Sequence, residues 1–197
     1  MVKLIAAAFT LVIITMIASC QPASPQPAPA PAPTAPAATL VAWAADGVIS
    51  PQEYPSRKAY GNWEINWRSE ANDVFIGIRA KTSGWVALGV QPASGMDRAD
   101  FIIGWVADGK TTLDDQFGQG LNHQPDSRLG GTNDITIFAG GEKDGYTVIE
   151  FRRALDTGDR FDVPLKKGTN KILWSFGTGD DITRQHAERG YGEISID

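Results

Sequence analysis

Three side chains in the sequence are of types that bind metals or metal cofactors. Beyond its first sixteen residues the chain has one methionine, Met96, and its two histidines are His123 and His186. Met96 lies in a polar stretch, 92–100, and His186 lies in a second one, 180–190. A thioether and an imidazole form a known axial pair for haem iron, in which the thioether raises the reduction potential. The ordinary alternative is an incidental methionine and a surface histidine, which residue types alone favour.

Other chemistries have weaker signals. His123 could bind iron in place of His186, but it is surrounded by turn-forming residues, and we interpret it as a surface residue. Asp114, Asp115 and Asp126 offer hard oxygen ligands for calcium, but their spacing matches no EF-hand loop, so we interpret them as charges at turns. The sequence contains no Gly-x-Ser-x-Gly motif of a serine hydrolase and no Gly-x-Gly-x-x-Gly dinucleotide motif.

Composition excludes several classes of protein. The 197 residues carry a formal net charge of −5, which argues against a nucleic-acid partner because phosphate binding needs a basic surface. The chain has one cysteine, so it has no intrachain disulfide and no multi-thiolate zinc or iron–sulfur site.

The elements that position these residues are predicted to be strands. Apolar and polar residues alternate repeatedly after residue 40, and no segment keeps helical periodicity over three turns. Strands are expected over 63–67, 74–78, 85–90, 101–106, 135–137, 146–151, 171–176 and 192–196. Asp144-Gly145 predicts a tight hairpin turn. The pattern predicts an all-β fold, an antiparallel, immunoglobulin-like β-sandwich covering residues 40–197.

The N-terminal residues have a different composition. Residues 1–19 have a positive Lys3 and then an apolar run, as in a signal peptide. The run ends at Cys20 in a pattern that resembles the lipobox of bacterial lipoproteins, which implies a lipidated cysteine and a membrane anchor. Residues 20–39 are rich in Pro and Ala and predict an extended, semi-rigid spacer.

The domain resembles the DOMON family, in the branch similar to the cytochrome domain of cellobiose dehydrogenase. The matching segments are 84–90, 96–105, 151–159, 172–177 and 186–190, together with Asp126. Their order and spacing, more than any single segment, carry the resemblance, which runs from about Trp43 to Ile196.

The resemblance implies that Met96 and His186 are the axial ligands of a haem. The absence of Cys-x-x-Cys-His makes this a non-covalent haem b. Cations near the ligands are candidates for the haem propionates, and large apolar residues are candidates for the pocket walls. These candidates are Arg98, Arg184 and Arg189, and Trp85, Phe101 and Trp105.

The expected function is single-electron transfer by a lipid-anchored domain facing the periplasm or cell surface. A haem with both axial positions filled by protein passes electrons and activates no bound molecule, so the chain is not expected to be an enzyme by itself. The expected partner is a redox protein or a quinone-linked carrier. The alternative is a haem-free DOMON module that binds a sugar or another small ligand, as other branches are thought to do.

Overall fold

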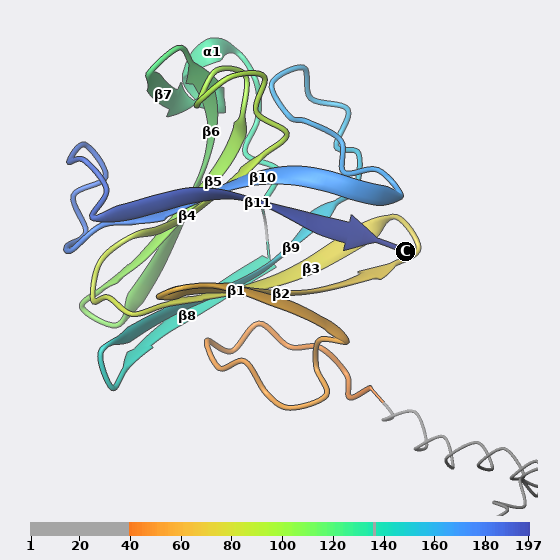
Figure 1. Cartoon of the computed structure of the whole chain (residues 1–197), viewed down its shortest axis with the longest axis vertical. Coiled ribbons are helices and arrows are strands. Elements are labelled where there is room, and N and C mark those ends of the chain that lie inside the picture. The colour runs from red at the N-terminus through yellow and green to blue at the C-terminus, as the bar shows by residue number, and fades with distance from the viewer. Residues whose placement is uncertain (1–39, 136) are drawn as a thin grey trace, which may run out of the picture. The chain divides into compact units, whose positions relative to one another are not determined.

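Two antiparallel β-sheets face each other in the computed structural model, which describes residues 40–135 and 137–197 (Figure 1). The five-stranded sheet has the order β1 (Ser56–Tyr60), β2 (Trp63–Glu70), β3 (Asp73–Ala80), β9 (Tyr146–Ala154) and β8 (Ile137–Lys143). The six-stranded sheet has the order β11 (Glu188–Ile196), β10 (Gly168–Phe176), β4 (Val86–Val90), β5 (Asp100–Ala107), β6 (Lys110–Gln119) and β7 (Asn122–Pro125). A short helix, α1 (Asp126–Leu129), follows β7. The predicted all-β sandwich is confirmed.

The main core lies between the two sheets. Alternate residues of β3 face inward, and Val74, Ile76 and Ile78 are at most 1% exposed. Ile76 pairs with Phe151 of β9, which is also fully buried. Full burial of a side chain of this size contributes about 1.5–3 kcal/mol, so the apolar alternation of the sequence determines which face of each strand turns inward.

The turn between β8 and β9 is the predicted tight hairpin. Asp144 and Gly145 both have positive φ, 55° and 76°. Two central residues of this kind match the right-handed twist of the flanking strands, which is why Asp-Gly favours the turn.

A second apolar cluster covers the outer face of the six-stranded sheet. Every residue of β4 is buried, although only alternate ones face the main core. On the other face, Ala87 joins side chains of β5 and β10 and the residues that precede β4 and β5. We call this set the outer cluster: Trp85, Ala87, Ala99, Phe101, Ile103 and Leu173. Met96, Trp105 and Ile182 pack against it. The outer face of this sheet therefore has an apolar surface on which loops and a ligand can lie.

The structure differs from the sequence-based expectation at four strands. A strand was expected over 135–137, whereas β8 runs over Ile137–Lys143. β1, β6 and β7 were not predicted, since none of them shows apolar alternation; β6 contains Asp114, Asp115 and Gln116 in succession. Within the described ranges, no helix is long and apolar enough to cross a membrane. The predicted signal peptide, the lipidated Cys20 and the spacer lie outside the described residues.

Candidate cofactor pocket

A pocket of about 820 Å³ opens on the outer face of the six-stranded sheet. Its volume falls in the range of about 300–1,000 Å³ that holds small-molecule ligands and cofactors. Six of the eight residues that the resemblance suggests for a haem line it: Trp85, Met96, Phe101, Arg184, His186 and Arg189. The fold thus brings the two predicted ligand-bearing loops to one site.

The Met96 loop, 91–99, is fixed by backbone hydrogen bonds to the end of β6. The Arg98 N–H donates to the Gly118 carbonyl at 2.9 Å, and the Gly118 N–H donates to the Ala99 carbonyl at 2.8 Å. A Cβ atom at Gly118 would lie 1.9 Å from the Met96 carbonyl oxygen. The close approach of the two backbones at this point needs a glycine. In this position of the loop, the half-buried Met96 side chain packs against the outer cluster.

The His186 loop, 177–187, is held at both ends. The Ala187 N–H donates to the Phe176 carbonyl at 2.8 Å, and the Gly177 N–H donates to the Trp85 carbonyl at 2.9 Å. The Trp85 indole lies so close to Gly177 that a Cβ there would be 2.2 Å from Nε1. Burial, and then the charge of Arg189, hold the pKa of His186 below its usual value. The neutral imidazole is the form that binds a metal.

The floor of the pocket combines apolar and small residues. Ala87, Phe101 and Leu173 of the outer cluster line it. The Phe101 ring lies across Gly89, where a Cβ would be 2.7 Å from ring atom Cε1. Because Gly89 has no side chain, the Phe101 ring lies close to the sheet and forms part of an apolar floor.

His123 also lines this pocket, and its interpretation as a surface residue is wrong. It lies on β7, opposite Gly118 of β6, and its ring centroid is 5.9 Å from that of Phe101. Its Nδ1 hydrogen-bonds with Oε1 of Gln116, an acceptor, so Nδ1 carries the proton and Nε2 has a free lone pair. This placement follows from the pairing of β7 with β6, and β7 was not predicted from the sequence.

Two predicted residues lie outside the lining. Arg98 is paired with Asp97 at 3.7 Å, and its side chain is 74% exposed. Trp105 packs against the outer cluster without lining the pocket. Arg128 and Tyr191 line it and were not singled out in the sequence. The lining cations are thus Arg128, Arg184 and Arg189.

The interpretation of the acidic residues needs a second correction. Asp115 and Asp126 are 3% and 1% exposed, so they are not solvated turn charges. Burial, and then the charge of Asp100, raise the pKa of Asp115 to about 8. The apolar context that signals burial is missing around these residues in the sequence. Asp114, by contrast, lines the pocket.

The geometry defines an antiparallel β-sandwich domain with a pocket of ligand size on the outer face of one sheet. Residues 57–177 match the family model of the DOMON domain, and this chain belongs to the DOMON family. The family inferred by resemblance is confirmed.

Two solved structures of cytochrome domains have a similar fold. One is the cytochrome b domain of pyranose dehydrogenase from Coprinopsis cinerea, with a TM-score of 0.50 and 14% identity, covering 67% of this chain and 74% of that one. The other is the cytochrome domain of Myriococcum thermophilum cellobiose dehydrogenase, with a TM-score of 0.51 and 12% identity, covering 68% and 75%. At these identities the comparison shows the shared fold.

A relative of known sequence is the DBH-like monooxygenase protein 1 of Mus musculus. It is 30% identical over 148 residues, which cover 72% of this chain and 24% of the relative. The chain therefore spans about a quarter of that relative's length.

Proposed function

We propose that this chain is a b-type haem domain that transfers electrons, with Met96 and His186 as the axial ligands of the iron. The observation that carries the proposal is that these two side chains, on separate loops, line one pocket with an apolar floor. The fold shared with two cytochrome domains supports the same cofactor.

The residues around the pocket fit a haem. A thioether and an imidazole are suitable axial donors, and the outer cluster supplies the apolar surface that a porphyrin face needs. Arg184 and Arg189 lie in the lining, where guanidinium groups can bind the propionate carboxylates.

The ligand set determines what the site does. Haem supplies a one-electron couple when bound. Met96 and His186 would hold the iron from the two loops, and a haem held by two protein ligands would pass electrons and activate no bound molecule. The Met96 thioether raises the reduction potential relative to a second imidazole, and the outer cluster keeps water from the porphyrin face.

The proposal includes the setting of the domain. The chain acts as an electron carrier and not as an enzyme by itself, and it exchanges electrons with a redox protein or a quinone-linked carrier. Cys20 carries a lipid that anchors the chain to a bacterial membrane, facing the periplasm or the cell surface, and the Pro/Ala-rich residues 20–39 space the domain from that membrane.

The absorption spectrum of the chain purified with haem tests the ligands. We expect a low-spin spectrum whose bands sharpen on reduction. Met96→Ala and His186→Ala each open one axial position, so each variant is expected to turn largely high-spin and to bind carbon monoxide when reduced. His123→Ala is the matched control, because it removes the other imidazole of the same pocket, and it is expected to stay low-spin.

Two outcomes contradict the proposal. If the low-spin spectrum survives Met96→Ala but is lost in His123→Ala, the second iron ligand is His123 and not the Met96 thioether. A colourless chain that takes up no added haem but binds a saccharide would support the alternative, a haem-free binding module.

A further inference from the structure

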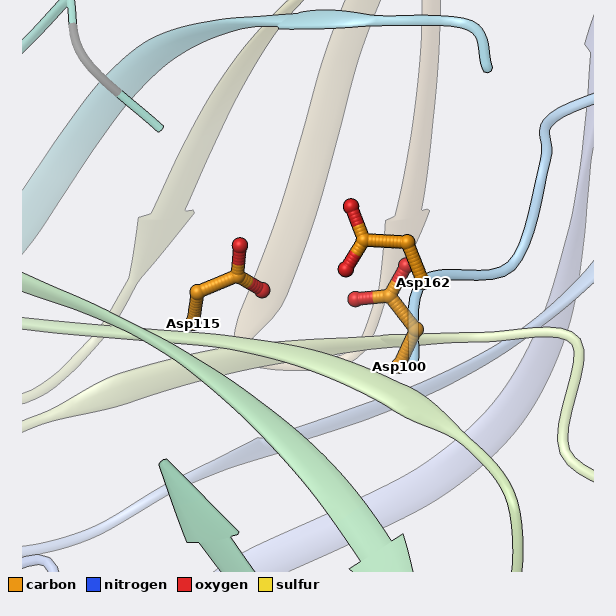
Figure 2. Close-up of side chains that lie close together, drawn as sticks. All are labelled: Asp100, Asp115 and Asp162. Atoms are coloured by element: carbon orange, nitrogen blue, oxygen red, sulfur yellow. The ribbon is translucent and has the colours of Figure 1, made fainter. Parts of the chain in front are cut away.

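Four aspartates meet inside the sandwich, and none of them belongs to the pocket. Asp100 and Asp115 lie on the core-facing side of β5 and β6, Asp126 begins α1, and Asp162 lies between β9 and β10. They are 1%, 3%, 1% and 8% exposed, respectively. Figure 2 shows the carboxyl groups of Asp100, Asp115 and Asp162 turned toward a common space.

One guanidinium group lies in this cluster, and it pairs with two of the four carboxyl groups. Arg153 of β9 reaches across the sandwich, and its Nη2 lies 2.7 Å from Asp100 Oδ2 and 3.3 Å from Asp162 Oδ2. The Val163 N–H also donates to Asp100 Oδ2, at 3.0 Å. If all four carboxyl groups are ionised, three negative charges remain uncompensated in the interior, where a charge without a partner is costly.

The other oxygens of the cluster lack donors. Asp100 Oδ1, Asp115 Oδ1 and both carboxylate oxygens of Asp162 are buried without a hydrogen-bond partner. Asp115 Oδ2, in contrast, accepts from the Asp134 N–H at 2.9 Å. The existing donors therefore serve one oxygen of Asp100 and one of Asp115, and leave the second oxygen of each free.

Asp126 gives an independent indication of a ligand. Both of its carboxylate oxygens are buried without a partner. The antiparallel pairing of Gln116 with Pro125 brings Asp126 beside Asp115, the next position along both chains. After burial, the charges of Asp162 and then Asp100 raise the pKa of Asp126. A side chain that opens a helix turn normally faces water or caps a backbone N–H, and this one does neither.

We infer that Asp100, Asp115, Asp126 and Asp162 form a buried binding site for a divalent cation, Ca²⁺. One oxygen from each of Asp100, Asp115 and Asp162 lies within 4.8 Å of the others. Oxygens that share one Ca²⁺ at about 2.4 Å are separated by up to ~4.8 Å, so the spacing suits this ion. Ca²⁺ accepts irregular sets of six to eight oxygens, whereas Mg²⁺ demands an octahedron and keeps its waters, which a closed interior does not favour.

The site joins segments that are distant in the sequence. A cation here holds together β5, β6, the start of α1 and the segment between β9 and β10. β5 and β6 carry Phe101 and Gln116 of the pocket on their other face. The ion thus stiffens the back of the pocket, and its binding does not depend on what the pocket holds.

Calcium titration of the full chain, freed of metal with a chelating resin, tests this inference. We expect one site by calorimetry, and a rise in Tm of about 5–10 °C at a hundredfold excess over Kd. Asp115→Asn and Asp126→Asn should each weaken binding at least tenfold and remove most of the Tm shift. Asp114→Asn is the matched control, because it removes the same charge from the opposite face of the same strand, and it should bind Ca²⁺ as the parent does.

A measurement in EDTA separates a cation site from damage to the fold. Without cation the parent suffers the carboxylate repulsion, so Asp115→Asn should be at least as stable as the parent in EDTA. The inference is overturned if millimolar Ca²⁺ produces neither heat nor a Tm shift, since protons or buried water would then neutralise the cluster. It is also overturned if Asp115→Asn and Asp126→Asn bind Ca²⁺ like the parent, or if Mg²⁺ binds more tightly than Ca²⁺.

Discussion

The two faces of β5 and β6 carry opposite chemistry. Phe101 and Gln116, which pair across the strands, face the outer pocket, while Asp100 and Asp115, one residue before each, face the interior. A strand turns successive side chains to opposite faces, so one of two adjacent residues lines the outer pocket and the other lies in the charged interior. The outer face is closed by loops that leave room for a ligand, whereas charges on the inner face need compensation from within the protein.

The largest expected effect concerns the interior charges. Arg153→Ala leaves Asp100 and Asp162 without their guanidinium group, and removing one partner of a buried ion pair costs about 3–5 kcal/mol. Arg152→Ala is the matched control: Arg152 pairs with Asp73 at 3.1 Å with its side chain 43% exposed, so the loss should stay below about 1 kcal/mol. Urea unfolding in EDTA measures both. Equal losses would show that the inner face has no special electrostatic role.

The next effect concerns the outer face. Gly118→Ala drives a Cβ into the Met96 carbonyl oxygen and displaces loop 91–99, which should destabilise the chain by about 1–3 kcal/mol. It should also weaken haem binding at least tenfold, as measured by haem titration. Gly179→Ala is the control, because nothing lies within 4 Å of its Cβ position, and it should change neither quantity. Unchanged haem binding in Gly118→Ala would mean that this anchor does not position Met96.

Unlike the interior aspartates, the buried carboxylate of Glu150 has hydrogen-bond donors for both of its oxygens. Glu150 of β9 accepts from the N–H groups of Asp46, Gly47 and Val48 and from the Tyr54 O–H, which lies at 2.8 Å. Burial raises the pKa of Glu150 to about 7, although the Tyr54 hydrogen bond acts in the opposite direction.

A folded-state pKa above the unfolded value of 4.5 gives stability that is fully present below about pH 4.5 and is lost as the pH rises through about 7. With Ca²⁺ saturating, Glu150→Gln should therefore flatten the decline of unfolding free energy between about pH 5 and 8. The Tm of this variant should rise with Ca²⁺ as that of the parent does, because the Glu150 carboxylate already has four hydrogen-bond donors and needs no cation. If the unfolding free energies of variant and parent change with pH in parallel, the raised pKa of Glu150 is contradicted.

The smallest effect concerns the pocket's cations. The Arg184 side chain is 83% exposed, and exposed ion pairs contribute little, so Arg184→Ala should weaken haem binding by less than about fivefold. The loss should shrink further at high salt. Arg98→Ala, which removes an exposed arginine outside the lining, should leave haem affinity unchanged. A loss of a hundredfold or more in Arg184→Ala would place this arginine deep in the site.

Much of the fold could be predicted because burial leaves a period-two pattern. β2, β3 and β9 each bury alternate apolar side chains, and Asp144-Gly145 marks the hairpin. β6 could not be predicted in the same way, since one of its faces lines a pocket and the other carries Asp115. A polar functional residue on a strand weakens the pattern that identifies the strand.

The candidate site was predictable only in part. Met96 and His186 were singled out by rarity and by resemblance, and both line the pocket. His123 was interpreted as a surface residue because its place in the pocket depends on the pairing of β7 with β6. The acidic cluster was missed because Asp162 and Arg153 join it through the packing of two sheets, and isolated charges in a sequence resemble ordinary surface residues.

X-ray absorption at the iron edge of the haem-loaded chain tests the central claim most directly. Ligation by Met96 and His186 predicts one sulfur in the first shell of the iron, which is lost in Met96→Leu and retained in His123→Ala. A first shell of nitrogen alone in the parent, or a sulfur that persists in Met96→Leu, would contradict the account.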